Sequence, residues 1–80
     1  MEIREILAAN LRKYRKITGL SQEELAHRAD IDRTYISSLE RCQYAASIDV
    51  LARLAQELGV EAADLLQKAP RSTSRAKRGV

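Results

Sequence analysis

The sequence has few of the residues that stabilise small domains or bind metals. It contains one cysteine and one histidine in 80 residues. A single cysteine cannot form an internal disulfide, and one cysteine with one histidine makes no ligand cluster for a metal. A chain this short also buries a smaller share of its surface than a larger domain does. A second subunit is one common source of the missing stability.

Long apolar runs are missing as well. No stretch approaches the roughly 20 apolar residues needed to cross a bilayer. Charges at Glu2, Arg4 and Glu5 interrupt the segment where a signal peptide would carry its apolar core. Together with the lone cysteine, this pattern predicts a protein of the reducing cytoplasm that does not contact membranes.

Signals for catalysis are also absent from the sequence. We find no nucleophile elbow, phosphate loop or paired acid–base set. His27 is interpreted as a surface residue, and Cys42 as an inert loop thiol, because no second cysteine could resolve an oxidised form. The sequence therefore predicts no enzymatic activity, no metal, no cofactor and, with no room for a sensing domain, no small-molecule ligand.

Charge is distributed unevenly along the chain. Residues 1–67 hold nine basic and eleven acidic residues, a net of −2, whereas residues 68–80 hold five basic residues and no acid. Within residues 1–67 the basic side chains lie mainly in the first half, and acids gather near the end. A basic face opposite an acidic one suits docking of a polyanion from one side. We expect a folded domain over 1–67 and a flexible basic tail over 68–80.

Apolar periodicity and capping residues predict five helices and no strand. The expected fold is an all-α, five-helix bundle of the phage-repressor DNA-binding type. Its helices run from Ile3 to about Thr18, from Ser21 to about Asp30, from Asp32 to about Arg41, from Ser47 to Gly59, and from Val60 to Leu66. Ile3 and Ile48 belong to the apolar faces of the first and fourth helices.

The joint between the second and third helices consists of only a few residues, Asp30 to Asp32. A joint this short makes the helices cross steeply, as in a helix-turn-helix. The outer side of the third helix offers Arg33, Thr34, Ser37 and Ser38, and no large apolar residue. A helix that enters a DNA major groove needs such a slim, hydrogen-bonding face.

The residues at these positions also resemble a known family. The run Leu-Ser-Gln-Glu-Glu-Leu-Ala at 20–26 resembles the second-helix signature of Xre/Cro regulators. The run Asp-Arg-Thr-Tyr-Ile-Ser-Ser-Leu-Glu-Arg at 32–41 is similar to the recognition helix of the restriction–modification controller proteins in that family. The resemblance implies a transcriptional regulator that binds double-stranded DNA as a homodimer on a palindromic operator.

The resemblance also implies roles for individual residues. Arg33, Thr34 and Ser38 match positions that face base edges, and Arg15 and Glu40 match an ion pair between the first and third helices. The implied contacts to the DNA backbone come from Gln22, Tyr35 and the loop residues Cys42, Gln43 and Tyr44, where the family's backbone amides approach a phosphate. Two residues depart from the family pattern: Cys42 stands where glycine is usual, and Ala46 where proline is frequent.

The apolar residues of the last two helices are more numerous than one small domain can hide. We therefore expect part of this set to form the dimer interface, namely Leu58, Val60, Leu65 and Leu66. The basic tail is interpreted either as solubilising or as a weak phosphate binder. An alternative function is a protein-interaction module on the same fold, of the antitoxin or coactivator type. Retention of Gln22, Arg33 and Thr34 argues against that alternative.

Overall fold

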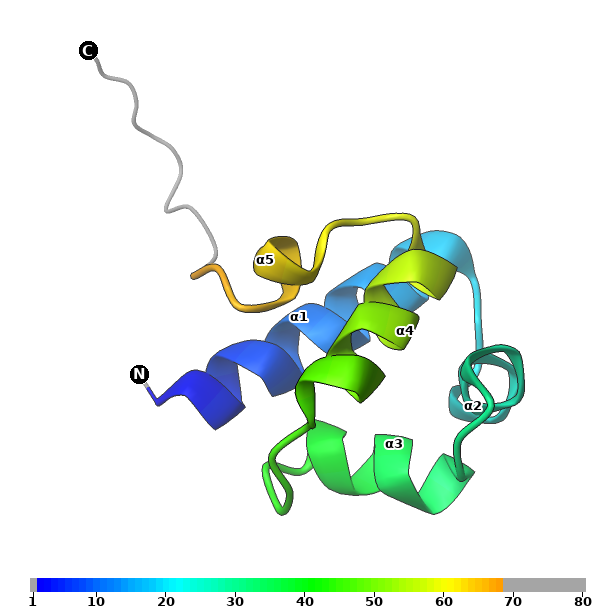
Figure 1. The fold of residues 1–80 in the computed structure, drawn as a ribbon, viewed down its shortest axis with the longest axis horizontal. Coiled ribbons are helices and arrows are strands. Elements are labelled where there is room, and N and C mark those ends of the chain that lie inside the picture. The colour runs from blue at the N-terminus through cyan, green and yellow to red at the C-terminus, as the bar shows by residue number, and fades with distance from the viewer. Residues whose placement is uncertain (1, 69–80) are drawn as a thin grey trace, which may run out of the picture.

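The computed structural model describes residues 2–68, which form five α-helices and no strand (Figure 1). The all-helical fold class predicted from the sequence is confirmed. The predicted tail from residue 69 onward lies outside the described residues. The helices are α1 (Ile3–Thr18), α2 (Gln22–Ala29), α3 (Arg33–Glu40), α4 (Ile48–Leu58) and α5 (Ala62–Leu65).

Helices α2, α3 and α4 begin directly after the polar residues that the sequence indicates. Before α2, the Ser21 hydroxyl accepts the Glu24 N–H and the Glu24 carboxylate accepts the Ser21 N–H, each at 3.0 Å. The hydrogen bond from the Ser21 backbone lowers the pKa of the Glu24 carboxyl below its usual value. Ser47 caps α4 by accepting the Val50 N–H at 3.1 Å. Asp32 occupies the N-cap position of α3, but its side chain makes no capping hydrogen bond.

The ends of the first two helices and of α4 adopt left-handed backbone conformations. Gly19 and Gly59 have φ values of 77° and 74°, and Asp30 has a φ of 59°. The Ile31 N–H then donates to the Ala26 carbonyl at 2.9 Å, which turns the chain sharply and brings Ile31 onto the core. The tight turn predicted at Asp30 is confirmed, and it sets the crossing of α2 and α3.

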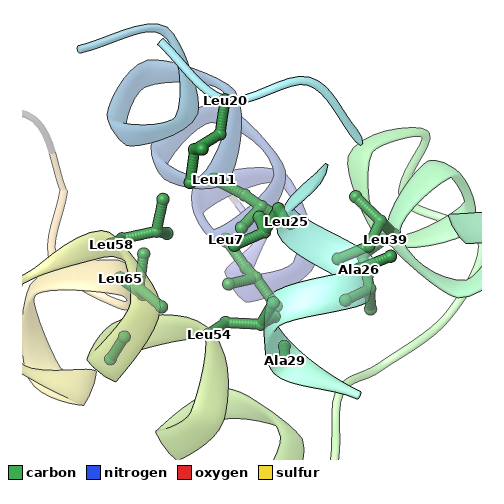
Figure 2. Close-up of a cluster of buried hydrophobic side chains, with 12 residues drawn as sticks. Leu7, Leu11, Leu20, Leu25, Ala26, Ala29, Leu39, Leu54, Leu58 and Leu65 are labelled. Atoms are coloured by element: carbon green, nitrogen blue, oxygen red, sulfur yellow. The ribbon is translucent and has the colours of Figure 1, made fainter. Parts of the chain in front are cut away.

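One core of leucine, isoleucine and alanine side chains lies between the helices (Figure 2). Its fully buried members include Leu11 from α1, Leu25 from α2 and Leu54 from α4. Leu58 and Leu65 also belong to it, with 4% and 0% of their surface exposed. This corrects their assignment to a dimer surface: α4 and α5 pack on α1, so both side chains are already covered within one chain.

Two isoleucines of the predicted apolar faces lie on the surface. Ile3 is 53% exposed and Ile48 is 84% exposed. Each is the first residue of its helix, α1 and α4 respectively. Helical periodicity places such residues on the apolar face, but the core of this chain does not extend to the helix starts.

A buried asparagine attaches the C-terminal end of the domain to α1. The Asn10 amide nitrogen donates to the carbonyls of Asp64, Leu65 and Gln67, at 3.3, 2.9 and 2.8 Å. These carbonyls lie at the end of α5, where helical hydrogen bonds run out. No local sequence signal indicates this anchor, because the partners are 54 to 57 residues away in the chain.

The arrangement leaves α3 at one edge of the domain. In Figure 1, α3 lies along the lower edge and α5 on the opposite side, with α1 and α4 between them. Helix α1 contacts α3, α4 and α5, and α2 contacts both α3 and α4. Among residues 2–68, none of the helices has the length and apolar character required to span a membrane.

Candidate nucleic-acid interface

Helices α2 and α3 pack against each other across the joint 30–32, and α3 presents its start to solvent. Arg33 and Thr34 are exposed in the first turn of α3, and Ser37 lies one turn further along, half-buried. Their side chains offer a planar guanidinium and two hydroxyls, and no large apolar group interrupts them. This face has the width and hydrogen-bonding character that a major groove accepts.

Ser38 does not belong to this face, which corrects the prediction from sequence. It is only 6% exposed. Helix α3 packs against α1 on one side and α2 on another, so the buried arc is wide and includes Ile36, Ser38, Leu39 and Glu40. Helical periodicity alone predicts a narrower apolar stripe on α3, which leaves Ser38 outside the buried arc. Ser37 remains on the polar face beside Arg33 and Thr34.

The buried carboxylate of Glu40 links α3 to α1. Arg15 donates from Nε to Oε2 at 2.8 Å and from Nη2 to Oε1 at 3.0 Å, a two-pronged ion pair. The side chains of Arg15 and Glu40 are 17% and 4% exposed. This hydrogen bonding raises the pKa of the Arg15 guanidinium. The geometry is that of the ion pair predicted from the sequence.

Two further side chains contact Glu40. Gln22, the first residue of α2, donates from its amide nitrogen to Oε1 at 3.0 Å. Arg12 donates to the backbone carbonyl of Glu40, at the last turn of α3. One residue therefore joins α1, α2 and α3, and fixes the orientation of the helix-turn-helix on the rest of the domain.

These contacts divide the cluster of four basic residues at 12–16 of α1, namely Arg12, Lys13, Arg15 and Lys16, into two groups. Arg12 and Arg15 are directed at Glu40. Lys13 lies over the ring of Tyr14, 5.0 Å from its centroid, and Lys16 is exposed in the last turn. Half of this basic cluster therefore serves the fold rather than an external polyanion.

The end of α3 is closed by a Schellman motif. The Cys42 N–H donates to the Leu39 carbonyl at 3.1 Å, and the Gln43 N–H to the Ser38 carbonyl at 2.8 Å. Cys42 adopts φ 62°, so a left-handed terminus forms although the residue is not glycine. The family resemblance implies that backbone amides of this loop approach a phosphate. The amides of Cys42 and Gln43 instead close the helix, so these two are not available to a phosphate.

Two tyrosines lie together beside the start of the following loop. Tyr35 of α3 is half-buried and Tyr44 is exposed. Their ring centroids are 5.9 Å apart, with the rings nearly perpendicular at 86°. This edge-to-face contact is a favourable aromatic geometry. It connects the loop to α3, next to the exposed polar face.

An apolar groove lies away from the polar face of α3, between the starts of α1 and α4 and the end of α5. Its cavity volume is about 220 Å³, and its lining consists of Ile3, Arg4, Leu7, Ala45, Ala46, Ile48, Leu51 and Leu66. Of the four residues predicted at a dimer interface, only Leu66 lines this groove. Val60 is half-buried against the core.

Residues 2–68 contain no group of three or more histidine, cysteine or acidic side chains arranged to hold a metal. The chemistry available on the exposed face is hydrogen bonding and positive charge. A steeply crossed helix pair with a slim polar second helix defines the helix-turn-helix class of protein.

Comparison with known proteins agrees with this geometry. Residues 11–65 match the family HTH_3, described as helix-turn-helix. The control protein C.SmaI of Serratia marcescens is 44% identical over 68 residues, covering 85% of this chain and 81% of that protein. The chain therefore belongs to the HTH_3 family of Xre-type helix-turn-helix transcription regulators, and the predicted resemblance is confirmed.

Solved structures give the same result. The hypothetical transcription factor NHTF from Neisseria has a TM-score of 0.81 at 40% identity, covering 84% of this chain and 77% of that one. The restriction–modification controller protein C.AhdI from Aeromonas hydrophila has a TM-score of 0.75 at 35% identity, covering 78% of this chain and 94% of that one.

Proposed function

We propose that this regulator binds a palindromic operator as a homodimer and acts as a restriction–modification controller. The observation that carries sequence-specific binding is the exposed polar start of α3, held rigidly by the buried Glu40. The controller role is supported by similarity to proteins named for it, C.SmaI and C.AhdI. Such a role would place the protein in the cytoplasm.

Arg33 is the proposed principal base-reading residue. It is the first residue of α3 and exposed, and a guanidinium fits the O6 and N7 acceptors of guanine. Thr34 and Ser37 would contribute shorter hydrogen bonds beside it. Gln22, at the start of α2, would bind a phosphate, where helix N-terminal amides and the helix dipole favour an anion. Tyr35 and Tyr44 are proposed backbone contacts.

The homodimer is proposed to form through the apolar groove of Ile3, Ile48 and Leu66. Large exposed apolar side chains in one place favour association, and three of the five such side chains among residues 2–68, those of Ile3, Ile48 and Leu66, line the groove. A two-fold dimer would set two copies of α3 about 34 Å apart, one turn of DNA, and would read a palindrome.

The test separates base reading from phosphate holding. An operator is first selected from random duplexes with the intact protein, and binding isotherms are then measured on operator and scrambled DNA. Arg33→Ala should cost about 1–3 kcal/mol on the operator and much less on scrambled DNA. Gln22→Ala should weaken both duplexes by similar factors, because phosphates carry no sequence information.

Arg53→Ala is a matched control for Arg33→Ala. Arg53 is an exposed arginine on α4, away from the joint of α2 and α3. Its loss should leave the preference for operator over scrambled DNA unchanged. Equal losses on both duplexes for Arg33→Ala would contradict base reading by Arg33. Failure of the intact protein to prefer any duplex would contradict the proposed function.

A further inference from the structure

The carboxylate of Glu40 contacts a residue that the proposed function places against DNA. Its Oε1 accepts hydrogen bonds from Arg15 Nη2 and Gln22 Nε2, both at 3.0 Å. Its Oε2 accepts Arg15 Nε at 2.8 Å. The two-pronged contact with Arg15 restricts the carboxylate plane, and the side chain is 4% exposed. Gln22 therefore meets a fixed acceptor.

The chemistry of this acceptor determines how the Gln22 amide is turned. A carboxylate oxygen accepts hydrogen bonds and donates none. The amide nitrogen of Gln22 must face Glu40, and its carbonyl oxygen must face elsewhere. An amide nitrogen carries two N–H groups, of which Glu40 takes one. The second N–H is left for another acceptor.

We infer that Glu40 is a positioning residue for DNA binding, because it holds the Gln22 amide with its second N–H available to a phosphate at the start of α2. This inference rests on the phosphate contact in the proposed function. Without the carboxylate, the amide is free to rotate and to turn its carbonyl oxygen toward the phosphate, where two acceptors repel. Glu40 itself is buried and touches no DNA.

A purely structural role for Glu40 gives a different expectation. In that case a Glu40 variant weakens DNA binding by loosening the helix-turn-helix, and the contribution of Gln22 is unaltered. Asn10→Ala supplies the matched control. It removes buried hydrogen bonds between α1 and the end of α5 and leaves the contact between Gln22 and Glu40 in place.

The experiment measures the loss of affinity caused by Gln22→Ala in three backgrounds: the intact sequence, Glu40→Gln and Asn10→Ala. A hydrogen bond to a charged group corresponds to about a tenfold change in affinity. We expect about tenfold loss in the intact sequence and in Asn10→Ala, and less than twofold in Glu40→Gln. Equal losses in all three backgrounds would overturn the inference. No loss in the intact sequence would also overturn it, while leaving operator binding established.

A second measurement covers the case in which Glu40→Gln does not fold. In DNA-free protein, the side-chain amide protons of Gln22 should resonate apart from those of Gln56, an exposed glutamine on α4. Glu40→Asp, whose shorter carboxylate cannot reach both partners, should bring the two sets together. Gln22 resonances that match those of Gln56 in the intact protein would refute the fixed amide.

Discussion

At the end of α3, Cys42 adopts a backbone conformation that a side chain disfavours. Its φ of 62° lies in the left-handed region, where the Cβ approaches the following carbonyl. Glycine is usual at this position in the family, and any other residue pays a steric cost for a left-handed helix terminus there. The terminus forms nevertheless, because the Schellman hydrogen bonds from Cys42 and Gln43 offset the cost. The strain remains in the folded protein.

Replacing Cys42 with glycine should therefore stabilise the domain. Glycine has no Cβ and adopts φ near 60° without strain, so we expect the free energy of unfolding to rise by about 1 kcal/mol. Urea unfolding measures the change. Cys42→Ala is the control, since it removes the thiol but keeps the Cβ, and it should not stabilise. A glycine variant no more stable than the alanine variant would contradict the role given to backbone strain.

Among the elements, helix boundaries could be predicted from the sequence because their signals are local. The capping box of Ser21 and Glu24 and the stop at Gly59 lie within one turn of the boundary they set. Which residues are buried depends on neighbouring elements and is harder to predict. Ser38 is covered because α3 packs against both α1 and α2, and Ile48 is exposed because no other part of residues 2–68 covers the start of α4.

The candidate site could likewise be predicted only where its signals are local in the sequence. The exposed positions of Arg33 and Thr34 follow from their place just after the N-cap of α3. The contact between Gln22 and Glu40 joins residues 18 positions apart on different helices. Periodicity carries no signal for such a contact, and only the crossing of the helices brings it about.

The anchor between α1 and α5 can be tested through Asn10. Asn10→Ala leaves carbonyls at the end of α5 without their donor, and a buried unsatisfied group costs about 1–3 kcal/mol. We expect the free energy of unfolding to fall by about 2 kcal/mol in chemical denaturation. Gln56→Ala, which removes an exposed amide from α4, should change it by less than about 0.5 kcal/mol. Similar values for both variants would show that the anchor contributes nothing.

At the scale of the whole molecule, the apolar groove between the starts of α1 and α4 gives a testable expectation about self-association. Ile48→Asp places a charge at its edge without disturbing the core, because Ile48 is 84% exposed. We expect the dissociation constant of the proposed dimer to rise by about a hundredfold, since each copy loses an isoleucine that the dimer would bury and gains a charge that must be desolvated. Sedimentation equilibrium measures this constant.

Ile17→Asp is the control for that substitution. Ile17 is also a surface isoleucine, 68% exposed, but it lies at the opposite end of α1 from the groove. Its replacement should leave the dissociation constant unchanged. An intact protein that stays monomeric at high micromolar concentration, or equal effects of the two substitutions, would contradict association through the groove.

The engagement of Arg12 and Arg15 by Glu40 bears on how DNA binding responds to ionic strength. Affinity falls with salt because cations newly brought to phosphates displace condensed counterions from the DNA, by about 0.9 per phosphate contact. An arginine already neutralised by a carboxylate inside the protein displaces few. Arg15 forms an ion pair with Glu40 and is therefore not a free charge, whereas Arg12 is exposed and donates to a neutral carbonyl that leaves its charge in place. Counterion release should accordingly be smaller than the number of basic residues in α1 suggests, and DNA binding should weaken less steeply as the salt concentration rises.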